Sequence, residues 1–172
     1  MWKQLLQERS FLDQYLILMF NILLVEAWCT GEQYQVILGK CFFFEKTRKT
    51  FSSAKQNCLS MTKQGKSGKL AEPTTLQMTT KLVEAAKNTF GNEGVLIGVE
   101  KIDNNGNMKY TSTGLKTPIS PWKERSSSVI SDVYDGMNQP YVCFYPRSSG
   151  QLIWHDCDDS ISKFSVCEFW WR

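Results

Sequence analysis

The sequence predicts an α+β fold, because strand-like runs lie on both sides of two helical patterns. The helical patterns begin near residues 50 and 74, where apolar side chains recur at spacings of three and four. The strand-like runs are rich in aromatic and β-branched side chains, and they cover residues 34–44, 95–99, 141–144 and 163–169. A chain of 172 residues is long enough for one domain with a single core once a leader is removed.

The first strand-like run, residues 34–44, predicts a β-hairpin. Gly39-Lys40 separates two halves rich in Val, Ile and Phe, as a hairpin turn does. Further along, the small and polar residues 65–68 predict a loop between the two helices.

Two amphipathic helices follow the hairpin. We expect the hydroxyl of Thr50 to cap the first helix, whose buried face carries Phe51, Ala54 and Cys58. In the second helix, Thr74 and Gln77 have the spacing of a capping box, and Gly91 is suited to end the helix. Its apolar stripe consists of Leu76, Val83, Ala86 and Phe90.

The second half of the chain predicts strands that are separated by a long irregular loop. Residues 95–99 have the composition of a buried strand, and residues 104–107 are a strong turn signal before a returning strand at 108–110. Residues 114–141 show little periodicity. A stretch of that length without regular structure is usually functional in a compact domain, so we expect the binding region there.

Residues 1–27 are typical of a signal peptide. Two basic residues precede an apolar run over residues 15–25, which is shorter than the roughly 20 residues that cross a bilayer and fits the apolar part of a signal peptide. We expect cleavage near Ala27, which leaves residues 28–172 as one domain and the protein secreted to the extracellular space. An uncleaved membrane anchor is the alternative, but an acidic residue stands at either end of the run.

The cysteines support export. In the secretory pathway six cysteines predict a disulfide framework, and none of them forms a Cys-x-x-Cys pair of the zinc-ribbon or thioredoxin kind. Six cysteines permit fifteen pairings, among which the spacing does not choose. They are Cys29, Cys41, Cys58, Cys143, Cys157 and Cys167.

Five short motifs occur in order along the chain. They are Phe51-x-x-Ala54-x-x-x-Cys58, Gly68-Lys69-Leu70-Ala71, Leu96-Ile97-Gly98-Val99, Trp154-His155-Asp156-Cys157 and Val166-Cys167-Glu168. Together they resemble the C-type lectin-like domain, over residues 29–169, with Phe51 and Leu96 where that family usually has Trp. The resemblance implies two helices, small antiparallel sheets and a long irregular loop. It also implies three disulfides: Cys58–Cys167, Cys143–Cys157 and, as in the long form of the domain, Cys29–Cys41.

The same resemblance implies a calcium site, most of which is missing here. The calcium-dependent members take ligands from a Glu-Pro-Asn or Gln-Pro-Asp triplet, from a Glu two residues before a Cys, and from an Asn-Asp pair. After Trp122 the chain reads Lys-Glu-Arg-Ser-Ser-Ser instead of a triplet, and Tyr141 stands two residues before Cys143. Calcium requires six to eight oxygen ligands, so calcium-dependent sugar binding is not expected.

The part of that site that matches lies in one strand motif. His155 takes the Asn position, where it offers nitrogen to an ion that prefers oxygen, and Asp156 is the one matching ligand. We therefore predict a ligand site of Trp122, Glu124, His155 and Asp156, in which Asp156 is the metal ligand of a degenerate calcium site and no cofactor is certain. Other loop oxygens could contribute, although ordinary solvated side chains explain them better: Glu124, Asp132, Asp135 and Asn138. Aromatic rings for stacking are Trp122, Tyr134, Tyr141 and Tyr145.

An enzyme is not expected. The pair His155-Asp156 is also found in secreted phospholipase A2, but the glycine-rich calcium loop of that enzyme is absent, and so is a Gly-x-Ser-x-Gly motif. The net charge of +3 is spread along the chain, so no nucleic-acid partner is expected. The sequence predicts a secreted C-type lectin-like protein that binds a glycan or cell-surface glycoprotein through its long loop. A calcium-independent protein-binding or inhibitory module is the alternative.

Overall fold

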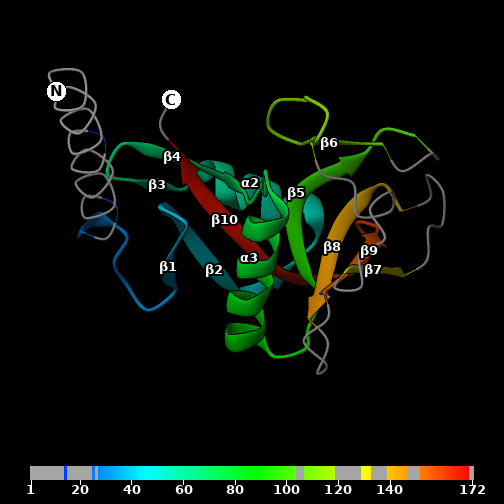
Figure 1. Cartoon of the computed structure of the whole chain (residues 1–172), viewed down its shortest axis with the longest axis horizontal. Coiled ribbons are helices and arrows are strands. Elements are labelled where there is room, and N and C mark those ends of the chain that lie inside the picture. The colour runs from blue at the N-terminus through cyan, green and yellow to red at the C-terminus, as the bar shows by residue number, and fades with distance from the viewer. Residues whose placement is uncertain are drawn as a thin grey trace, which may run out of the picture.

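A computed structural model of the chain describes residues 27–103, 107–118, 129–132, 139–146 and 152–170, with residues 14 and 25 as isolated positions. Within these ranges two helices and ten strands form the fold (Figure 1). In chain order the elements are β1 (Tyr34–Ile37), β2 (Lys40–Lys49), α2 (Phe51–Ser60), β3 (Thr62–Lys63), β4 (Lys66–Leu70), α3 (Leu76–Phe90), β5 (Val95–Lys101), β6 (Met108–Tyr110), β7 (Val129–Asp132), β8 (Tyr141–Pro146), β9 (Leu152–Cys157) and β10 (Lys163–Trp170).

The strands are joined in one hydrogen-bonded network with the order β1-β2-β10-β5-β8-β9-β7. The last strand, β10, lies at its centre between β2 and β5 (Figure 1). Strand β4 also pairs with β10, and β6 pairs with β5. Most pairs are antiparallel, as the sequence predicts, while β10 with β5 and β7 with β9 are parallel.

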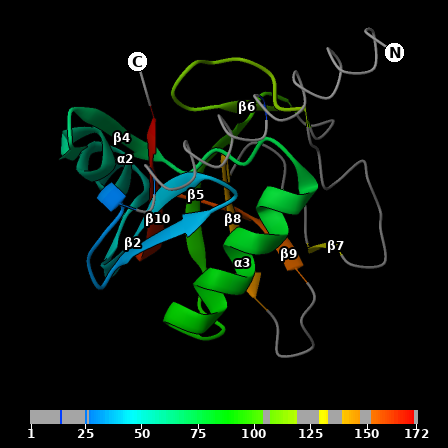
Figure 2. The same cartoon turned by 60° about the vertical axis from the view of Figure 1, so that its left-hand side comes forward.

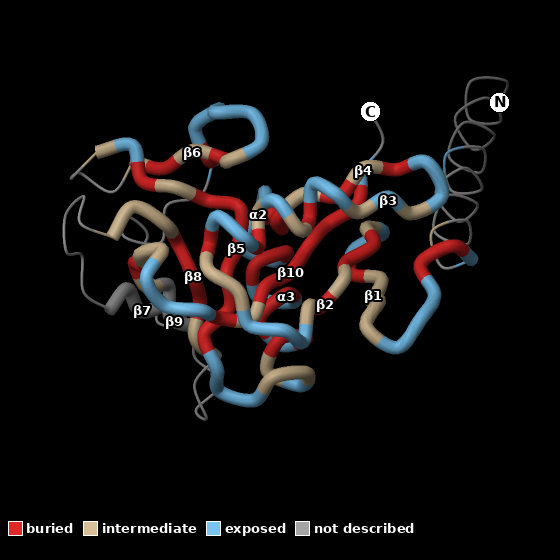
Figure 3. Tube along the Cα trace, turned by 180° about the vertical axis from the view of Figure 1, so that it is seen from behind, coloured by how far each residue is buried: buried red, intermediate tan, exposed pale blue. Residues whose placement is uncertain are grey.

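Alternation along the central strands divides the core between the two helices. In β5, the odd-numbered residues Val95, Ile97 and Val99 belong to the cluster that α3 covers, and Leu96 belongs to the cluster that α2 covers. Successive side chains of a strand point to opposite faces, so the two helices pack on opposite faces of the central sheet. Figure 2 shows α3 lying across one of these faces, and Figure 3 shows how completely β5 and β10 are buried between the two layers.

The β1–β2 hairpin forms with a turn one residue earlier than predicted. Ile37 pairs with Lys40, so the turn consists of Leu38 and Gly39, whose φ values are 48° and 73°. Two positive φ values at the centre of a two-residue turn match the twist of the flanking strands. Lys40 therefore belongs to β2, and the prediction of a Gly39-Lys40 turn was wrong by one position.

The predicted cap and buried face of helix α2 are both confirmed. Thr50 is the N-cap, and its hydroxyl accepts a hydrogen bond from the backbone N–H of Ser53. The carboxylate of Asp159, from the segment between β9 and β10, accepts from the backbone N–H of Ser52 at 2.8 Å and from its hydroxyl at 2.5 Å. The buried face of the helix is the predicted one: Phe51, Ala54 and Cys58.

Helix α3 begins one residue later than predicted. Its N-cap is Thr75, whose hydroxyl accepts from the N–H of Met78, so the capping box at Thr74 was wrong. Leu76 then falls in the first turn outside the apolar face and is 40% exposed. The rest of the stripe is confirmed, since Val83 and Ala86 are buried and Phe90 packs against the core. Gly91 ends the helix with φ 73°.

The predicted loop at residues 65–68 is largely a strand. Gln64 and Gly65 form a turn with positive φ, and β4 begins at Lys66. At Gly68 an added Cβ would lie 2.4 Å from the carbonyl oxygen of Cys58. Glycine therefore allows β4 to pass close to the end of α2, and this close approach rather than loop flexibility explains the residue.

The second half contains one strand that the sequence did not predict. Strand β7 lies inside the predicted irregular segment 114–141 and pairs in parallel with β9. Residues 104–106 of the predicted turn 104–107 lie outside the described residues, but the β5–β6 hairpin is confirmed by antiparallel pairing of Val99 with Tyr110. Strands β8 and β10 also confirm their predictions.

All three disulfides that the resemblance implied are present. Cys58–Cys167 joins α2 to β10, Cys143–Cys157 joins β8 to β9, and Cys29–Cys41 anchors the segment before β1 to β2. The first of these bridges is fully buried and connects residues 109 positions apart. It therefore fixes one of the two helices to the central strand.

Candidate functional site

The structure describes half of the predicted ligand site. His155 and Asp156 lie next to each other near the end of β9, whereas Trp122 and Glu124 lie outside the described residues. The same holds for the loop residues Tyr134, Asp135 and Asn138 and for the side chain of Asp132. The geometry that can be described is therefore that of the sheet end formed by β5, β8 and β9.

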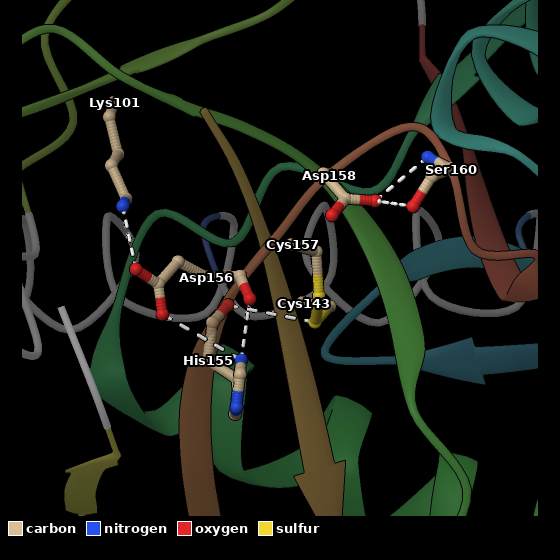
Figure 4. Close-up of a disulfide and its surroundings, with 7 residues drawn as sticks. All are labelled: Lys101, Cys143, His155, Asp156, Cys157, Asp158 and Ser160. Carbon is tan, nitrogen blue, oxygen red and sulfur yellow. Dashed lines mark hydrogen bonds and ion pairs between the residues drawn. A yellow bond between two sulfur atoms is a disulfide. The ribbon is translucent and has the colours of Figure 1, made fainter. Parts of the chain in front are cut away.

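Asp156 forms a buried ion pair with a lysine that the sequence analysis had not identified. The ammonium nitrogen of Lys101 lies 2.8 Å from Oδ2 of Asp156, and both side chains are 0% exposed. Figure 4 shows the lysine side chain extending toward this carboxylate. The positive charge of Lys101 thus compensates the negative charge of Asp156 inside the protein, where water does not screen either group.

Strand pairing brings these two residues together although they are 55 positions apart. Lys101 is the last residue of β5, and its backbone N–H donates to the carbonyl of Pro140, just before β8. On the other side of β8, Val142 pairs with Asp156 of β9. The side chain of Lys101 therefore crosses the start of β8 to reach the carboxylate on β9.

His155 lies beside the ion pair and is turned toward the backbone. Its Nδ1 lies 2.5 Å from the carbonyl oxygen of Asp156 and 3.7 Å from the Oδ1 atom of the same residue. The side chain is 33% exposed, and its ring meets the ring of Tyr145 edge to face, with centroids 5.4 Å apart. Both the carbonyl and the carboxylate of Asp156 therefore have a nitrogen of this chain close to them (Figure 4).

The disulfide Cys143–Cys157 borders the histidine. Among the described residues, the one group of three possible metal-binding side chains is Cys143, His155 and Cys157, whose ligand atoms all lie within 4.8 Å of one another. A thiolate is the form of cysteine that binds metal, and both cysteines are joined to each other. This group is therefore not a metal centre.

The residues at this sheet end do not fit a calcium ion. Six to eight oxygens must converge on calcium, and the one carboxylate that matches the calcium motif is held by Lys101. At the position of the missing Glu ligand, the ring of Tyr141 stacks on Phe51 with centroids 3.7 Å apart. That side chain is packed against the α2 cluster, so it leaves the calcium position without an oxygen ligand from β8.

The two carboxylates that come directly after Cys157 make other contacts. Asp158 accepts hydrogen bonds from the N–H and the hydroxyl of Ser160, and the hydroxyl of Ser160 is the first cause of a lowered pKa of Asp158. Asp159 accepts from Ser52 at the start of α2. The carboxylates of Asp158 and Asp159 therefore accept hydrogen bonds from Ser160 and Ser52 rather than adding to a shared cation site.

Sequence reasoning missed Lys101, and the available signal was weak. A lysine that ends the apolar strand Val95–Lys101 usually extends its ammonium group to solvent. Only the pairing of β5 with β8 and of β8 with β9 shows that this one turns inward.

Comparison with known proteins gives the same fold. No family model matches the sequence, and no curated protein matches it with significance. Among solved structures, the C-type lectin CEL-I from Cucumaria echinata superposes with a TM-score of 0.63 at 16% identity, over 83% of this chain and 99% of that one. Human lithostathine gives 0.59 at 20% identity, over 81% and 90%.

A third structure is the C-type lectin domain of murine dendritic cell inhibitory receptor 2 in complex with an N-glycan. It superposes with a TM-score of 0.59 at 13% identity, over 81% of this chain and 97% of that domain. Each of the three comparisons covers more than four fifths of this chain. This chain therefore has the C-type lectin-like fold, as its motifs predicted.

Proposed function

We propose that this protein is a secreted C-type lectin-like binding protein that recognises carbohydrate, or a glycoprotein at a cell surface, without calcium. The observation that carries the proposal is the buried ion pair of Lys101 with Asp156 in this fold. The long segment 114–141 and the adjoining end of β9 form the binding region in this proposal, with Trp122, Glu124, His155 and Asp156 as the site residues.

A carbohydrate partner is supported by the comparisons at a general level. One similar domain was solved in complex with an N-glycan, and another similar structure is a C-type lectin. Aromatic rings offer flat faces for stacking, and the ring of Tyr145 lies beside that of His155. We expect the glycan to contact such side chains directly, because no calcium ion bridges its hydroxyl groups to the protein.

A glycan array probed in calcium and in EDTA tests this proposal. We expect the same glycans to be bound in both conditions. A signal that is lost in EDTA would contradict the calcium-independent mechanism, and it would restore Asp156 as a metal ligand.

The second candidate is a protein-binding or inhibitory module that does not recognise sugar. It is favoured by the same loss of calcium ligands, since Tyr141 replaces a ligand with a packed ring. The array decides between the two candidates, because absence of any glycan signal in both conditions favours the protein ligand. Binding to cells before and after enzymatic removal of their glycans then shows which part of a glycoprotein is recognised.

Binding rather than catalysis is the better account of His155, the one histidine of the chain. A general base requires a partner that orients its imidazole. Here Nδ1 is directed to the carbonyl of Asp156, and the carboxylate of that residue is held by Lys101. Similar structures of this fold are binding domains, so we infer that the protein is not an enzyme.

Secretion is supported by the three disulfides, which form and persist in oxidising compartments. Within the described residues, no helix has the length and apolar composition needed to cross a membrane. We propose that residues 1–27 are a signal peptide and that the mature protein is the domain 28–172. Determination of the N-terminal residue after expression in animal cells should give a start near Trp28. A start before residue 15, with the protein in the membrane fraction, would contradict this.

A further inference from the structure

A carboxylate as deeply buried as that of Asp156 requires a positive charge beside it. The side chain is 0% exposed, and an ionised carboxylate in such surroundings is strongly destabilised unless it is paired or bound to metal. Where this fold binds calcium, the ion supplies that charge. In this chain the charge must come from another source if calcium is not bound.

Lys101 supplies this positive charge from a fixed position. Its ammonium nitrogen lies 2.8 Å from the Asp156 carboxylate, and its backbone is held by the hydrogen bond to Pro140. Asp156 is held in turn by the pairing of β9 with β8. Both residues belong to strands of the sheet and not to the long loop.

We propose that the ammonium group of Lys101 occupies the position beside Asp156 that a bound cation would take. Calcium therefore does not bind at this end of the sheet. The ammonium of Lys101 lies 2.8 Å from the carboxylate, so its positive charge offsets the negative charge of Asp156. A calcium ion would have to displace a side chain that is fully buried, and it would then meet the imidazole of His155, which lies 3.7 Å from the same carboxylate.

The test is a pair of charge-removing variants, compared by thermal unfolding in chelator and in calcium. Lys101→Gln removes the ammonium and leaves an amide oxygen in its place. Lys109→Gln is the matched control, because Lys109 also pairs with a carboxylate, that of Glu100 at 3.5 Å, but its side chain is 39% exposed. Wild type and Lys109→Gln should each have the same melting temperature in both conditions.

Lys101→Gln should unfold at least about 10 °C below wild type in chelator, because one partner of a buried pair has been removed. Calcium should leave the melting temperature of this variant unchanged, because Asp156 alone does not supply the six to eight oxygen ligands that the ion requires. The inference is contradicted if calcium stabilises the wild type, or if Lys101→Gln unfolds at the wild-type temperature.

A double variant keeps the test decisive if Lys101→Gln does not fold. Lys101→Gln combined with Asp156→Asn replaces the ion pair by two neutral amides. It should recover at least half of the lost melting temperature and show no response to calcium. A double variant that is no more stable than Lys101→Gln would overturn the inference. The inference rests on the calcium-independence in the proposed function, but none of these measurements involves a glycan, so they test the role of Lys101 separately from glycan recognition.

Discussion

Phe51 stacks on Tyr141, with ring centroids 3.7 Å apart and ring planes 8° from parallel. The contact joins the first residue of α2 to the first residue of β8. Both residues differ from the C-type lectin-like motifs, which have Trp at the first position and a calcium-binding Glu at the second. A ligand position of the calcium site has thus become part of the packing between helix and sheet.

Restoring the acidic residue should therefore harm the fold without restoring calcium binding. Tyr141→Glu places a carboxylate against the apolar α2 cluster and removes an aromatic pair, and it should lower the free energy of unfolding by about 3 kcal/mol. Tyr141→Leu, which remains apolar, should cost about 1 kcal/mol. Urea unfolding measures both variants, and equal stability of the two would show that this site tolerates a charge.

The disulfides should differ in their contributions. In the chain-entropy model, removal of Cys58–Cys167 by double alanine substitution should cost about 4–5 kcal/mol because its loop is long, since the two cysteines are 109 positions apart. Removal of Cys29–Cys41, with a separation of 12, should cost about 3 kcal/mol. The measurement is denaturant unfolding of the two variants, and the opposite order would show that the bridge before β1 is the main one.

Asp159 should make the fold sensitive to acid. Burial alone would raise its pKa, but the hydrogen bonds from the hydroxyl and the N–H of Ser52 bring the pKa below its ordinary value of 3.8. Because the folded-state pKa is the lower one, this stabilisation is present above about pH 4 and is lost as the pH falls through the folded-state pKa.

Asp159→Asn should therefore flatten the acid limb of the stability–pH curve and cost about 1 kcal/mol at neutral pH, as loss of a helix cap does. Ser52→Ala, which removes the hydroxyl donor and leaves the backbone N–H of residue 52, should give an intermediate effect. Unfolding free energies measured at a series of pH values test this. An unchanged acid limb in Asp159→Asn would contradict the assignment.

Tyr110 should make the fold sensitive to alkali. Burial, and then the negative charges of Glu72 and Glu168, raise its pKa from 10.0 to about 12. The stabilisation is complete below the unfolded-state value and is lost as the pH rises through about 12. The phenol also donates to the carbonyl of Pro73 at 2.9 Å.

Tyr110→Phe should therefore cost about 1 kcal/mol at neutral pH, which is the usual contribution of one hydrogen bond. It should also remove the component of the tyrosine absorbance titration that appears last as the pH rises. If all phenols of the wild type ionise together near pH 10, the assignment of the raised pKa to Tyr110 is wrong.

The sequence predicted those parts of the fold that depend on local pattern. The face of α2 with Ala54 and Cys58 follows from helical spacing, and the hairpins follow from glycine-containing turns. Errors of one residue arose where neighbours are chemically equivalent, as with Thr74 and Thr75, because either hydroxyl can cap a helix and backbone geometry decides between them. The three disulfide pairings came from the resemblance and not from spacing.

The remaining features depend on contacts between distant parts of the chain. Strand β7 exists through its parallel pairing with β9, which leaves no local signature. Asp156 was identified from its motif, but its partner Lys101 lies 55 positions earlier and is brought close only by two steps of strand pairing. Of the predicted site, Trp122 and Glu124 lie outside the described residues, and their roles stay predictions.

An isothermal calorimetric titration of the wild-type protein with calcium tests most directly the central claim that calcium does not bind at Asp156. The titration should reach about 10 mM, above the dissociation constants of roughly 0.1–1 mM that are typical of extracellular calcium modules. Because the Lys101 ammonium already holds the carboxylate of Asp156, we predict no saturable heat of binding. A saturable one-site isotherm that disappears in Asp156→Asn would contradict the account.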